Sequence, residues 1–436
     1  MPRLVDTLNP ARRITIRPEP ARQFGSAVDL RVALLGTYPP TQCGLATYLA
    51  STRSALACAR PAWSMPVIRV GESTAAGTTA APGVVATWRP GCRPSLFEAA
   101  EEIATTDCLL FEHEYGIFGG PNGNEILDLL DVVDVPVIAV LHTVLGRPST
   151  AQRQILPAIA RQSKRLVVMS NAARQLLLER YDVPSSKVQV IPHGAHPVPY
   201  IEPFCHDRRP LLLTWGLVGP GKGLEHAIRA VALLRHRGID VEYRIVGETH
   251  PNVRERDGER YRESLTELAS VLRVADLVSF DSGYQTVRAL AGHIAGADIV
   301  VIPYDSREQV TSGVLAEGLA GGKIIVATQF PHAVEVLASG CGLTVPHEDP
   351  VAMSQAIGSI VADPVRARRM SRGAHHVGRP MLWSAVAEST ATLIDSTVNA
   401  RNRECVPAIP VLEAGSNDAI HDPNLSQVRS AHRSSR

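Results

Sequence analysis

Residues 211–237 read LLLTWGLVGPGKGLEHAIRAVALLRHR, and the fold prediction starts from this segment. Its first part, Leu211–Gly216, is apolar without polar alternation, as expected for a strand that is buried on both faces of a sheet. A glycine-rich turn follows, and Leu224–Arg237 then has the spacing of an amphipathic helix. A buried strand, a glycine turn and a helix in this order are typical of an α/β domain with a parallel sheet.

The same order of elements recurs along the whole chain. In the first half, apolar runs predict strands at Leu30–Gly36, Val84–Trp88, Asp107–Glu112, Val135–His142, Arg165–Ser170 and Val188–Pro192. In the second half, they predict strands at Leu211–Gly216, Val241–Gly247, Leu277–Phe280, Ala297–Pro303, Lys323–Thr328 and Gly342–Val345. Amphipathic segments between them predict helices, among them Ala151–Ser163, Asn171–Tyr181, Leu224–Arg237, Gly258–Val274, Thr286–Gly296, Gly313–Ala320 and Val351–Ala362.

We therefore predict an α/β protein with two Rossmann-like domains, whose parallel sheets face each other across a cleft. The N-terminal domain is expected at residues 30–200 and the C-terminal domain at residues 201–380, with a breaker-rich join near residues 197–210. A last helix, Leu382–Asn399, is expected within residues 381–400. Residues 1–29 and the polar residues 401–436 are predicted to be a disordered lead-in and tail.

Composition and charge exclude several classes of protein. The chain has 436 residues, of which 45% are hydrophobic and 20% charged, and this is ordinary for a globular protein. A net charge of +1 gives no general attraction to nucleic acid, and 5% aromatic residues offer no base-stacking surface. Seven scattered cysteines without a C-x-x-C pair predict reduced thiols in a cytoplasmic protein. No apolar run approaches the ~20 residues that span a bilayer, so only peripheral contact with the inner face of a membrane stays open.

The turn at Gly216–Gly223 is the strongest candidate for a binding site. Its glycines let backbone N–H groups approach a phosphate, the helix N-terminus adds a partial positive charge, and Lys222 adds a full one. Gly216 to Lys222 nearly matches the Walker A pattern, but Gly223 stands where a P-loop has the Ser or Thr that binds magnesium. A P-loop-like NTPase that uses Gly216–Lys222 is therefore the alternative interpretation.

A second candidate follows the predicted strand Ala297–Pro303. Thr311 or Ser312 is a suitable N-cap, and Gly313 opens the next helix, whose free N–H groups could bind a phosphate or a sugar hydroxyl. Glu317 lies about one turn further, where its carboxylate could accept two hydrogen bonds from a ribose diol.

Polar residues at strand ends in the first half supply the opposite wall of the predicted cleft. One strand ends in His142, and another is followed by residues expected on the acceptor or sugar side, namely Glu112, His113, Glu114 and Tyr115. Consecutive residues of an extended chain point to opposite faces, so this Glu-His-Glu triplet is not expected to chelate a metal. No metal or other cofactor is predicted.

Together these segments resemble the family-4 retaining glycosyltransferases of the GT-B fold over roughly residues 30–395. The order and spacing of several motifs carry the resemblance: the Gly44 loop, His142-Thr143, Val168–Ser170, Val190–Gly194, the Gly216–Gly223 turn, Ile245–Gly247, and the Glu317 helix followed by Gly321–Thr328. In addition, Trp383-Ser384 is similar to the segment by which the C-terminal helix of such enzymes crosses back to the N-terminal domain.

The resemblance implies that a sugar moves from a nucleotide-diphospho-sugar donor to an acceptor hydroxyl, with retention at the anomeric carbon and without an obligatory metal. Lys222 would bind the donor diphosphate and Glu317 the ribose. Further donor contacts are implied for Gly44, Gly221, Gly247, Ser312, Gly313 and Val314. His142 and Gln309 are implied as the catalytic residues beside the transferred sugar. The acceptor, whether a glycan, a lipid or a small molecule, is expected on the N-terminal domain.

Two departures from the family pattern leave alternatives open. Gln309 replaces the first glutamate of the family's E-x7-E motif, and Leu217 replaces a usual arginine. A glutamine still hydrogen-bonds sugar hydroxyls, although without charge. A subgroup of family-4-like sequences is similar to this chain at Gln309–Gly313 and Gly247–Pro251, so an active enzyme is favoured over a catalytically silent sugar-nucleotide-binding protein or a sugar-nucleotide epimerase. Two loops, Val144–Thr150 and Pro251–Asp257, are expected to help select the base, the sugar and the acceptor.

Overall fold

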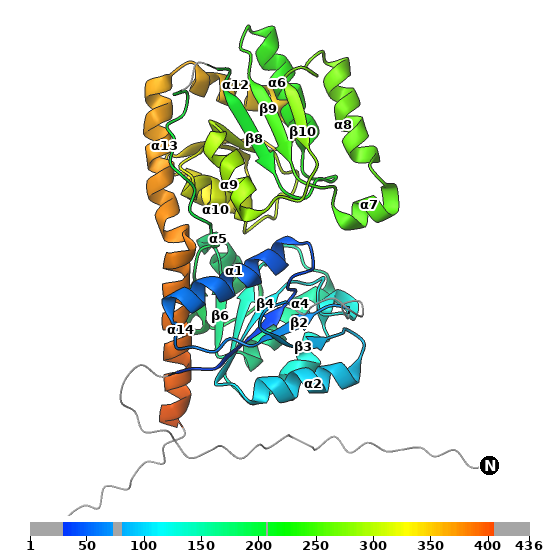
Figure 1. The fold of residues 1–436 in the computed structure, drawn as a ribbon, viewed down its shortest axis with the longest axis vertical. Helices are drawn as coiled ribbons and strands as arrows, with labels where there is room; N and C mark the ends of the chain where they lie inside the picture. Colours follow the sequence, from blue (N-terminus) through cyan, green and yellow to red (C-terminus); the bar gives the residue numbers. More distant parts are fainter. Residues whose placement is uncertain (1–28, 73–80, 206–207, 405–436) are drawn as a thin grey trace, which may run out of the picture.

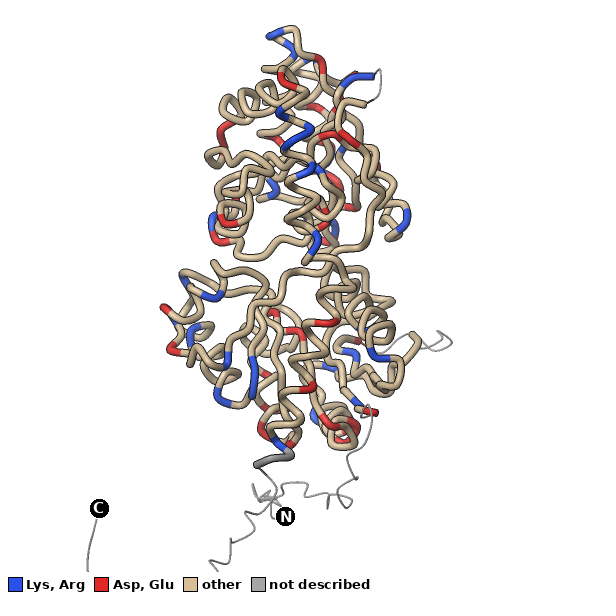
Figure 2. The backbone as a smooth tube through the Cα atoms, turned by 90° about the vertical axis from the view of Figure 1, so that its left-hand side faces the viewer, with Lys and Arg blue, Asp and Glu red and all other residues tan. Residues whose placement is uncertain are grey.

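The computed structural model describes residues 29–72, 81–205 and 208–404, and these residues form two lobes, each built around a parallel sheet (Figure 1). Acidic and basic residues are interspersed along both lobes, in keeping with the net charge of +1 (Figure 2). The predicted lead-in, except for Asp29, and the tail from residue 405 onward lie outside the described residues. None of the helices in the described ranges has the length and apolar character needed to cross a membrane.

The first sheet has the strand order β3-β2-β1-β4-β5-β6-β7, and every neighbouring pair is parallel. Its strands are β1 (Val32–Gly36), β2 (Val67–Val70), β3 (Val84–Trp88), β4 (Cys108–His113), β5 (Val137–Leu141), β6 (Arg165–Val168) and β7 (Val188–Val190). The register places His113 opposite Leu141, so the carboxyl ends of β4 and β5 lie side by side. The residues that follow these two strands therefore reach the same edge of the sheet.

Helices cover both faces of the first sheet. One face packs against α2 (Arg93–Ala104), α3 (Ile126–Leu130), α4 (Thr150–Gln162) and α5 (Asn171–Arg180) through one apolar cluster. The other face packs against α1 (Gly44–Ala59) and the C-terminal helix α14 (Trp383–Glu404) through a second cluster. Alternate residues of each strand enter different clusters, which is why the strands are apolar throughout.

The second sheet has the order β10-β9-β8-β11-β12-β13 and is also parallel. Its strands are β8 (Leu211–Trp215), β9 (Glu242–Val246), β10 (Val278–Asp281), β11 (Ile299–Ile302), β12 (Ile324–Thr328) and β13 (Gly342–Val345). One face is covered by α6 (Leu224–His236), α8 (Arg260–Val271) and α12 (Pro350–Val361). Helices at the other face are α9 (Val287–Gly296), α10 (Gly313–Ala320) and α11 (Pro331–Leu337), and α13 (Pro364–Gly378) contributes to both clusters.

The C-terminal helices connect the two lobes along one side of the molecule (Figure 1). Helix α13 packs on the second lobe, the short turn Arg379–Met381 follows, and α14 packs against α1 of the first lobe. Ala195 fixes this connection, because its N–H donates to Met381 O at 2.7 Å and its carbonyl accepts from Trp383 N at 3.0 Å. The predicted helix Leu382–Asn399 is thus real but longer, ending at Glu404.

The predicted architecture of two parallel-sheet Rossmann-like domains with a returning C-terminal helix is confirmed. Several segments differ from the sequence prediction, and α11 and α13 were not among the predicted helices. Strand β2 was not predicted, because Arg69 interrupts its short apolar run. Pro251–Asp257, expected as a loop, forms helix α7, which His250 caps by accepting a hydrogen bond from Asn252 N at 3.2 Å.

Candidate functional site

The turn after β8 holds Lys222 at the edge of the second sheet. Gly223, at φ +64°, begins α6, and a Cβ there would lie 1.9 Å from Pro303 O, so only glycine fits. The Lys222 ammonium sits 4.5 Å from the centre of the Tyr304 ring, and within the described ranges it pairs with no carboxylate. Gly221 is exposed, and its carbonyl accepts a hydrogen bond from Asp305 N at 3.1 Å. This bond connects the turn to the loop that follows β11. The Lys222 ammonium is therefore available to bind an anion.

Gly247, a predicted donor contact, supports the same turn from behind. It ends the β9 segment at φ +134°, and a Cβ there would lie 2.1 Å from Gly216 O. Its N–H already donates to Asp281 O at 2.8 Å, and its carbonyl accepts from Arg262 at 2.6 Å. Because both its polar groups are engaged, the predicted contact between Gly247 and the donor is corrected to a packing role beneath the turn.

The N-terminus of α10 faces the first lobe. Ser312 is its N-cap, and the hydroxyl accepts from Leu315 N at 3.3 Å. However, Ser312 N–H donates to Nδ1 of the buried His332 at 3.0 Å, so the predicted contact between this N–H and a donor is wrong. The N–H groups of Gly313 and Val314 belong to the first helical turn, where no partner exists within the helix. These two groups remain suited to an anion.

Glu317 and Lys222 are linked through Trp215, the last residue of β8. The Trp215 indole donates to the Glu317 carboxylate at 2.9 Å, and Trp215 and Lys222 line the same small cavity with Tyr304. Burial raises the pKa of Glu317 to about 7, although the hydrogen bond from Trp215 opposes the rise. The ammonium, the α10 N-terminus and this carboxyl group therefore belong to one region of the second lobe.

Gln309 lies in the loop before α10, and the first lobe holds that loop. The Gln309 side-chain amide donates to the Thr311 carbonyl. The next residue, Val310, is buried in the apolar cluster of the first lobe, and its carbonyl accepts from the Ser170 hydroxyl at 2.7 Å. The position of Gln309 therefore depends on both lobes.

His142 lies at the end of β5 and is the first-lobe residue that sequence analysis placed beside the sugar. Its Nε2 is 2.6 Å from the Glu112 carboxylate, and its ring meets the edge of Tyr48 with centroids 4.8 Å apart. His193 lies within the Val190–Gly194 motif but was not predicted as a site residue, and its ring centroid is 4.9 Å from that of Tyr48. A Cβ on Gly313 would lie 2.9 Å from His193 Cε1, so this imidazole touches the start of α10.

His193 is neutral because burial and the nearby His142 lower its pKa to about 3. Its Nδ1 donates to Gly194 O at 2.8 Å, which leaves Nε2 as an acceptor close to Gly313. The sequence signal for this residue is its place three residues after β7, at the same sheet edge as His142.

Two residues predicted on the acceptor side are corrected by the structure. His113 is fully buried, stacked on Phe118 with centroids 6.4 Å apart, and Tyr115 lies in the same apolar cluster. Burial lowers the pKa of His113 to about 3, so this ring is a neutral core residue. Successive residues of a strand alternate in direction, which sends His113 to one face of the sheet and Glu112 to the other. Neither His113 nor Tyr115 can contact an acceptor in this structure.

The remaining predicted residues of the first lobe stay at the sheet edge. The Glu114 carboxylate accepts from the Thr143 hydroxyl at 2.5 Å and from Tyr115 N at 2.9 Å, so it organises the two strand ends. Gly44 opens α1 and is exposed with free space around it. One turn later, the Thr47 hydroxyl lies 3.0 Å from the Tyr284 hydroxyl of the second lobe. Gly44 is therefore close to a point where the lobes meet.

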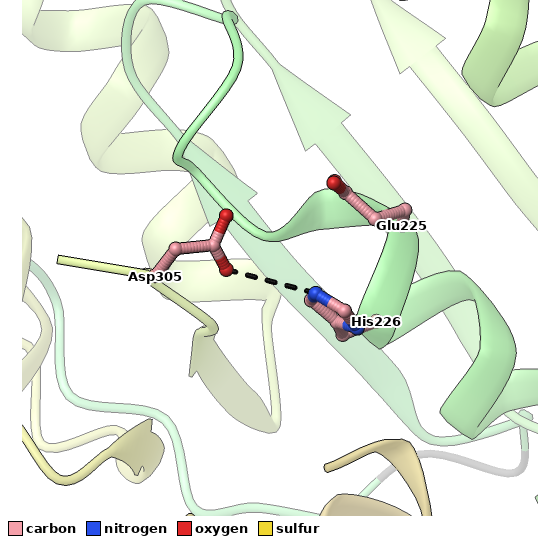
Figure 3. Close-up of side chains that lie close together, drawn as sticks. All are labelled: Glu225, His226 and Asp305. Atoms are coloured by element: carbon pink, nitrogen blue, oxygen red, sulfur yellow. Dashed lines mark ion pairs between the residues drawn. The ribbon is translucent and has the colours of Figure 1, made fainter. Parts of the chain in front are cut away.

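Figure 3 shows a group of side chains whose donor atoms could hold a metal ion: Glu225 and His226 at the start of α6, and Asp305 after β11. Their nearest ligand atoms lie within 4.8 Å of one another, and His226 Nε2 is 3.7 Å from Asp305 Oδ1. Glu225 also accepts from the Tyr261 hydroxyl at 2.7 Å. These contacts link α6, α8 and the β11 loop next to the Lys222 turn.

Two family models match the chain. Residues 118–197 match the model described as Glycosyltransferase Family 4, and residues 209–363 match the model described as Glycosyl transferases group 1. These ranges cover the carboxyl half of the first lobe and most of the second, including the Lys222 turn and Glu317.

Curated relatives include mannosyltransferases of two Mycolicibacterium species. The chain is 33% identical over 177 residues to a GDP-mannose-dependent alpha-(1-6)-phosphatidylinositol monomannoside mannosyltransferase of Mycolicibacterium smegmatis, covering 38% of this chain and 43% of that protein. It is 26% identical over 243 residues to an MMP alpha-(1->4)-mannosyltransferase of Mycolicibacterium hassiacum, covering 55% of this chain and 56% of that protein. The match thus spans about half the length of these relatives.

Solved structures share the arrangement of the two lobes. A sucrose-phosphate synthase from Thermosynechococcus elongatus superposes with a TM-score of 0.66 at 19% identity, over 85% of this chain and all of that one (100%). The Anabaena protein Alr3699/HepE in complex with UDP superposes with a TM-score of 0.64 at 13% identity, over 84% of this chain and 100% of that one. At such identities the likeness concerns the fold.

Proposed function

Because this chain belongs to glycosyltransferase family 4 and has the GT-B fold, we propose that it transfers a sugar from a nucleotide-diphospho-sugar donor to an acceptor hydroxyl. In this proposal, residues 201–380 bind the donor and residues 30–200 the acceptor, with retention at the anomeric carbon and no obligatory metal. The observation that carries it is that Trp215 links Lys222 and Glu317 of α10, while His193 of the first lobe touches the α10 N-terminus and shares Tyr48 with His142.

The chemistry of the donor fits these residues. Departure of a nucleoside diphosphate develops negative charge on phosphate oxygens, and preorganised donors stabilise that charge as it forms. Lys222 would supply a full positive charge, and the N–H groups of Gly313 and Val314 would supply oriented dipoles. Together they do what a divalent cation does in metal-dependent transferases, which is why the proposal needs no metal.

Each residue proposed to bind the nucleotide-sugar donor has its own role. Glu317 would accept hydrogen bonds from the ribose, at the expense of part of its bond to Trp215. Gln309, as a neutral amide, would bind a hydroxyl of the transferred sugar, and Gly44 would approach the diphosphate from the first lobe. The UDP bound to the Anabaena protein and the GDP-mannose dependence named for the mycobacterial relative support a nucleotide-sugar donor as a class.

A binding experiment tests the proposed function. UDP-, GDP- and ADP-sugars are screened by thermal shift and then by calorimetry, with wild type and Lys222→Ala. We expect one nucleotide class to raise Tm, and Lys222→Ala to weaken its binding by about 10- to 100-fold, because a charge-assisted contact is worth about 1.5–3 kcal/mol. Arg229→Ala, which removes an exposed cation from the same helix, is the matched control and should bind like wild type.

The alternatives give different results in the same assay. Magnesium-dependent ATP hydrolysis that Lys222→Ala abolishes, without binding of any sugar nucleotide, would replace the proposal with an NTPase. Donor binding without turnover on glycan, lipid or small-molecule acceptors would identify a silent binding protein. Interconversion of sugar nucleotides without an acceptor would identify an epimerase.

A further inference from the structure

Glu112 and His142 form a buried pair beneath the open edge of the first sheet. Glu112 Oε2 lies 2.6 Å from His142 Nε2, and the side chains are 1% and 9% exposed, respectively. The sequence position of Glu112 had suggested contact with an acceptor, but the buried carboxyl group cannot reach one. Whatever it contributes must pass through His142, whose Nδ1 has no hydrogen-bond partner within the described ranges and is not sealed in the interior.

Among the residues that the structure describes, no lysine or arginine pairs with the Glu112 carboxyl, and His142 is its partner. Its second oxygen, Oε1, is buried without a partner, and Glu112 lines a small cavity between α1, α14 and the sheet. The residues that line this cavity include neither lysine nor arginine: Tyr48, Thr52, Leu110, Glu112, Val140, Val167, Ile191, Trp383, Val386, Ala387 and Thr390. A net negative charge at this place would be strongly disfavoured, so the pair is expected to be neutral overall.

The titratable groups that face the pair do not change this balance. They are Tyr48 on α1 and His193 after β7, whereas His113 on β4 points to the opposite face of the sheet, against Phe118. Burial lowers the pKa of both histidines to about 3 and raises the pKa of the Tyr48 phenol, so all three are neutral near pH 7. Burial also raises the pKa of Glu112, although its hydrogen bond with His142 opposes part of the rise.

Neutrality decides where the two protons of the pair lie. One proton occupies the bridge between Oε2 and Nε2, whichever of the two atoms holds it. A neutral pair is either a carboxylate with a doubly protonated imidazole or a carboxylic acid with a singly protonated imidazole, and both forms contain two protons. Since one proton lies in the bridge, the other is on Nδ1 in both forms. His142 consequently offers an N–H to a ligand, and a pair that had lost one proton would offer a lone pair instead.

We propose that Glu112 is a positioning residue that makes His142 a hydrogen-bond donor, through Nδ1–H, to an oxygen of the bound donor substrate. The proposal rests on the proposed function for the identity of the substrate, but the state of the pair is a property of the free protein. Tyr48 and Glu112 together fix the ring, one by an edge contact and the other by the hydrogen bond. This resembles the way in which a buried carboxylate orients a catalytic imidazole in other enzymes.

A double-mutant cycle tests whether Glu112 acts through His142. We expect His142→Ala to lower kcat by about 100-fold, as removal of a single preorganised donor does. Glu112→Gln should lower kcat by about tenfold in the wild-type background but by less than about twofold when His142 is already alanine. Equal losses in both backgrounds would mean that Glu112 acts only on the fold. Glu101→Gln, at an exposed glutamate of α2, is the matched control and should match wild type.

A second measurement is independent of turnover. In protein with 15N-labelled histidine, the nitrogen shifts of His142 report which ring nitrogens carry a proton. We expect a proton on His142 Nδ1 at pH 7 in the free wild type, and a different distribution of protons between the two ring nitrogens in Glu112→Gln. An unprotonated Nδ1 at pH 7 would overturn the proposal. If no sugar is ever transferred, the proposed function fails, and this measurement still decides the state of the pair.

Discussion

Glu317 combines burial with a place at the candidate donor site, and this has a consequence for stability. Its pKa of about 7 in the folded protein exceeds the value of 4.5 expected for an exposed glutamate. The folded state therefore binds more protons than the unfolded state between about pH 4.5 and 7, so stability falls as the pH rises through this window. Above this window the buried, charged carboxylate lowers the free energy of unfolding.

We predict that Glu317→Gln is more stable than wild type at pH 8, by up to about 3 kcal/mol, and not more stable at pH 4.5. The neutral amide oxygen can still accept from Trp215, so only the charge is removed. Calorimetric Tm values of both proteins at the two pH values measure the effect. A stability difference that does not change with pH would contradict the assignment. The same substitution should weaken nucleotide binding if Glu317 holds the ribose.

Individual side chains also show where sequence reasoning ends. Glu112 and His113 are neighbours in the sequence, and both were predicted on the acceptor side. In the structure one lies under His142 and the other in the core beside Phe118. A pattern of apolar residues locates the end of a strand, but both faces of this sheet are covered, so it contains no signal for which face a polar residue joins.

Among the elements, the contact between the β8 and β9 turns places the strictest demand on the sequence. Gly247 brings its backbone against Gly216, and a Cβ at Gly247 would lie 2.1 Å from Gly216 O. Both partners of this contact are backbone, so neither can move aside as a side chain would. A positive φ of +134° at Gly247 adds to the cost of any other residue.

We predict that Gly247→Ala destabilises the protein by at least about 3 kcal/mol, since overpacking and backbone strain add. Gly292→Ala is the matched control, because Gly292 lies within α9 with open space at its Cβ and should gain about 0.5–1 kcal/mol in helix propensity. Denaturant unfolding followed by circular dichroism measures both. Equal stability of the two variants would show that the Gly216 contact can relax.

In the molecule as a whole, the two lobes are joined by contacts that reach the candidate site. Glu335 of α11 accepts three hydrogen bonds at the start of α5, two from Asn171 at 3.0 and 2.9 Å and one from Ala172 N at 2.7 Å. A carboxylate at a helix N-terminus is favoured by the helix dipole. Beside it, Ser170 binds Val310, which precedes the α10 N-terminus by only two residues.

We predict that Glu335→Ala loosens the docking of the lobes and raises the donor KM by about tenfold, while Lys222 and Glu317 stay intact. The loss of charge-assisted hydrogen bonds, each worth about 1.5–3 kcal/mol, is the cause. Small-angle scattering should record a larger radius of gyration than in wild type. Glu179→Gln, on the exposed side of α5, is the control. An unchanged scattering curve and KM would show that the α13–α14 connection alone sets the arrangement.

The amino-acid sequence alone determined the fold class, the positions of most strands, the returning helix and the two helix starts with Lys222 and Gly313. These follow from apolar runs, glycine turns and N-caps, which are signals within a few residues of one another. The tertiary structure alone decided four contacts. Glu112 hydrogen-bonds His142, and His332 accepts from the Ser312 N–H. His193 contacts Gly313, and Glu335 hydrogen-bonds the first lobe. Such pairs are far apart in the chain, 30 residues for Glu112 and His142 and 164 for Asn171 and Glu335. They meet only because strand register and the docking of two separate sheets bring them together.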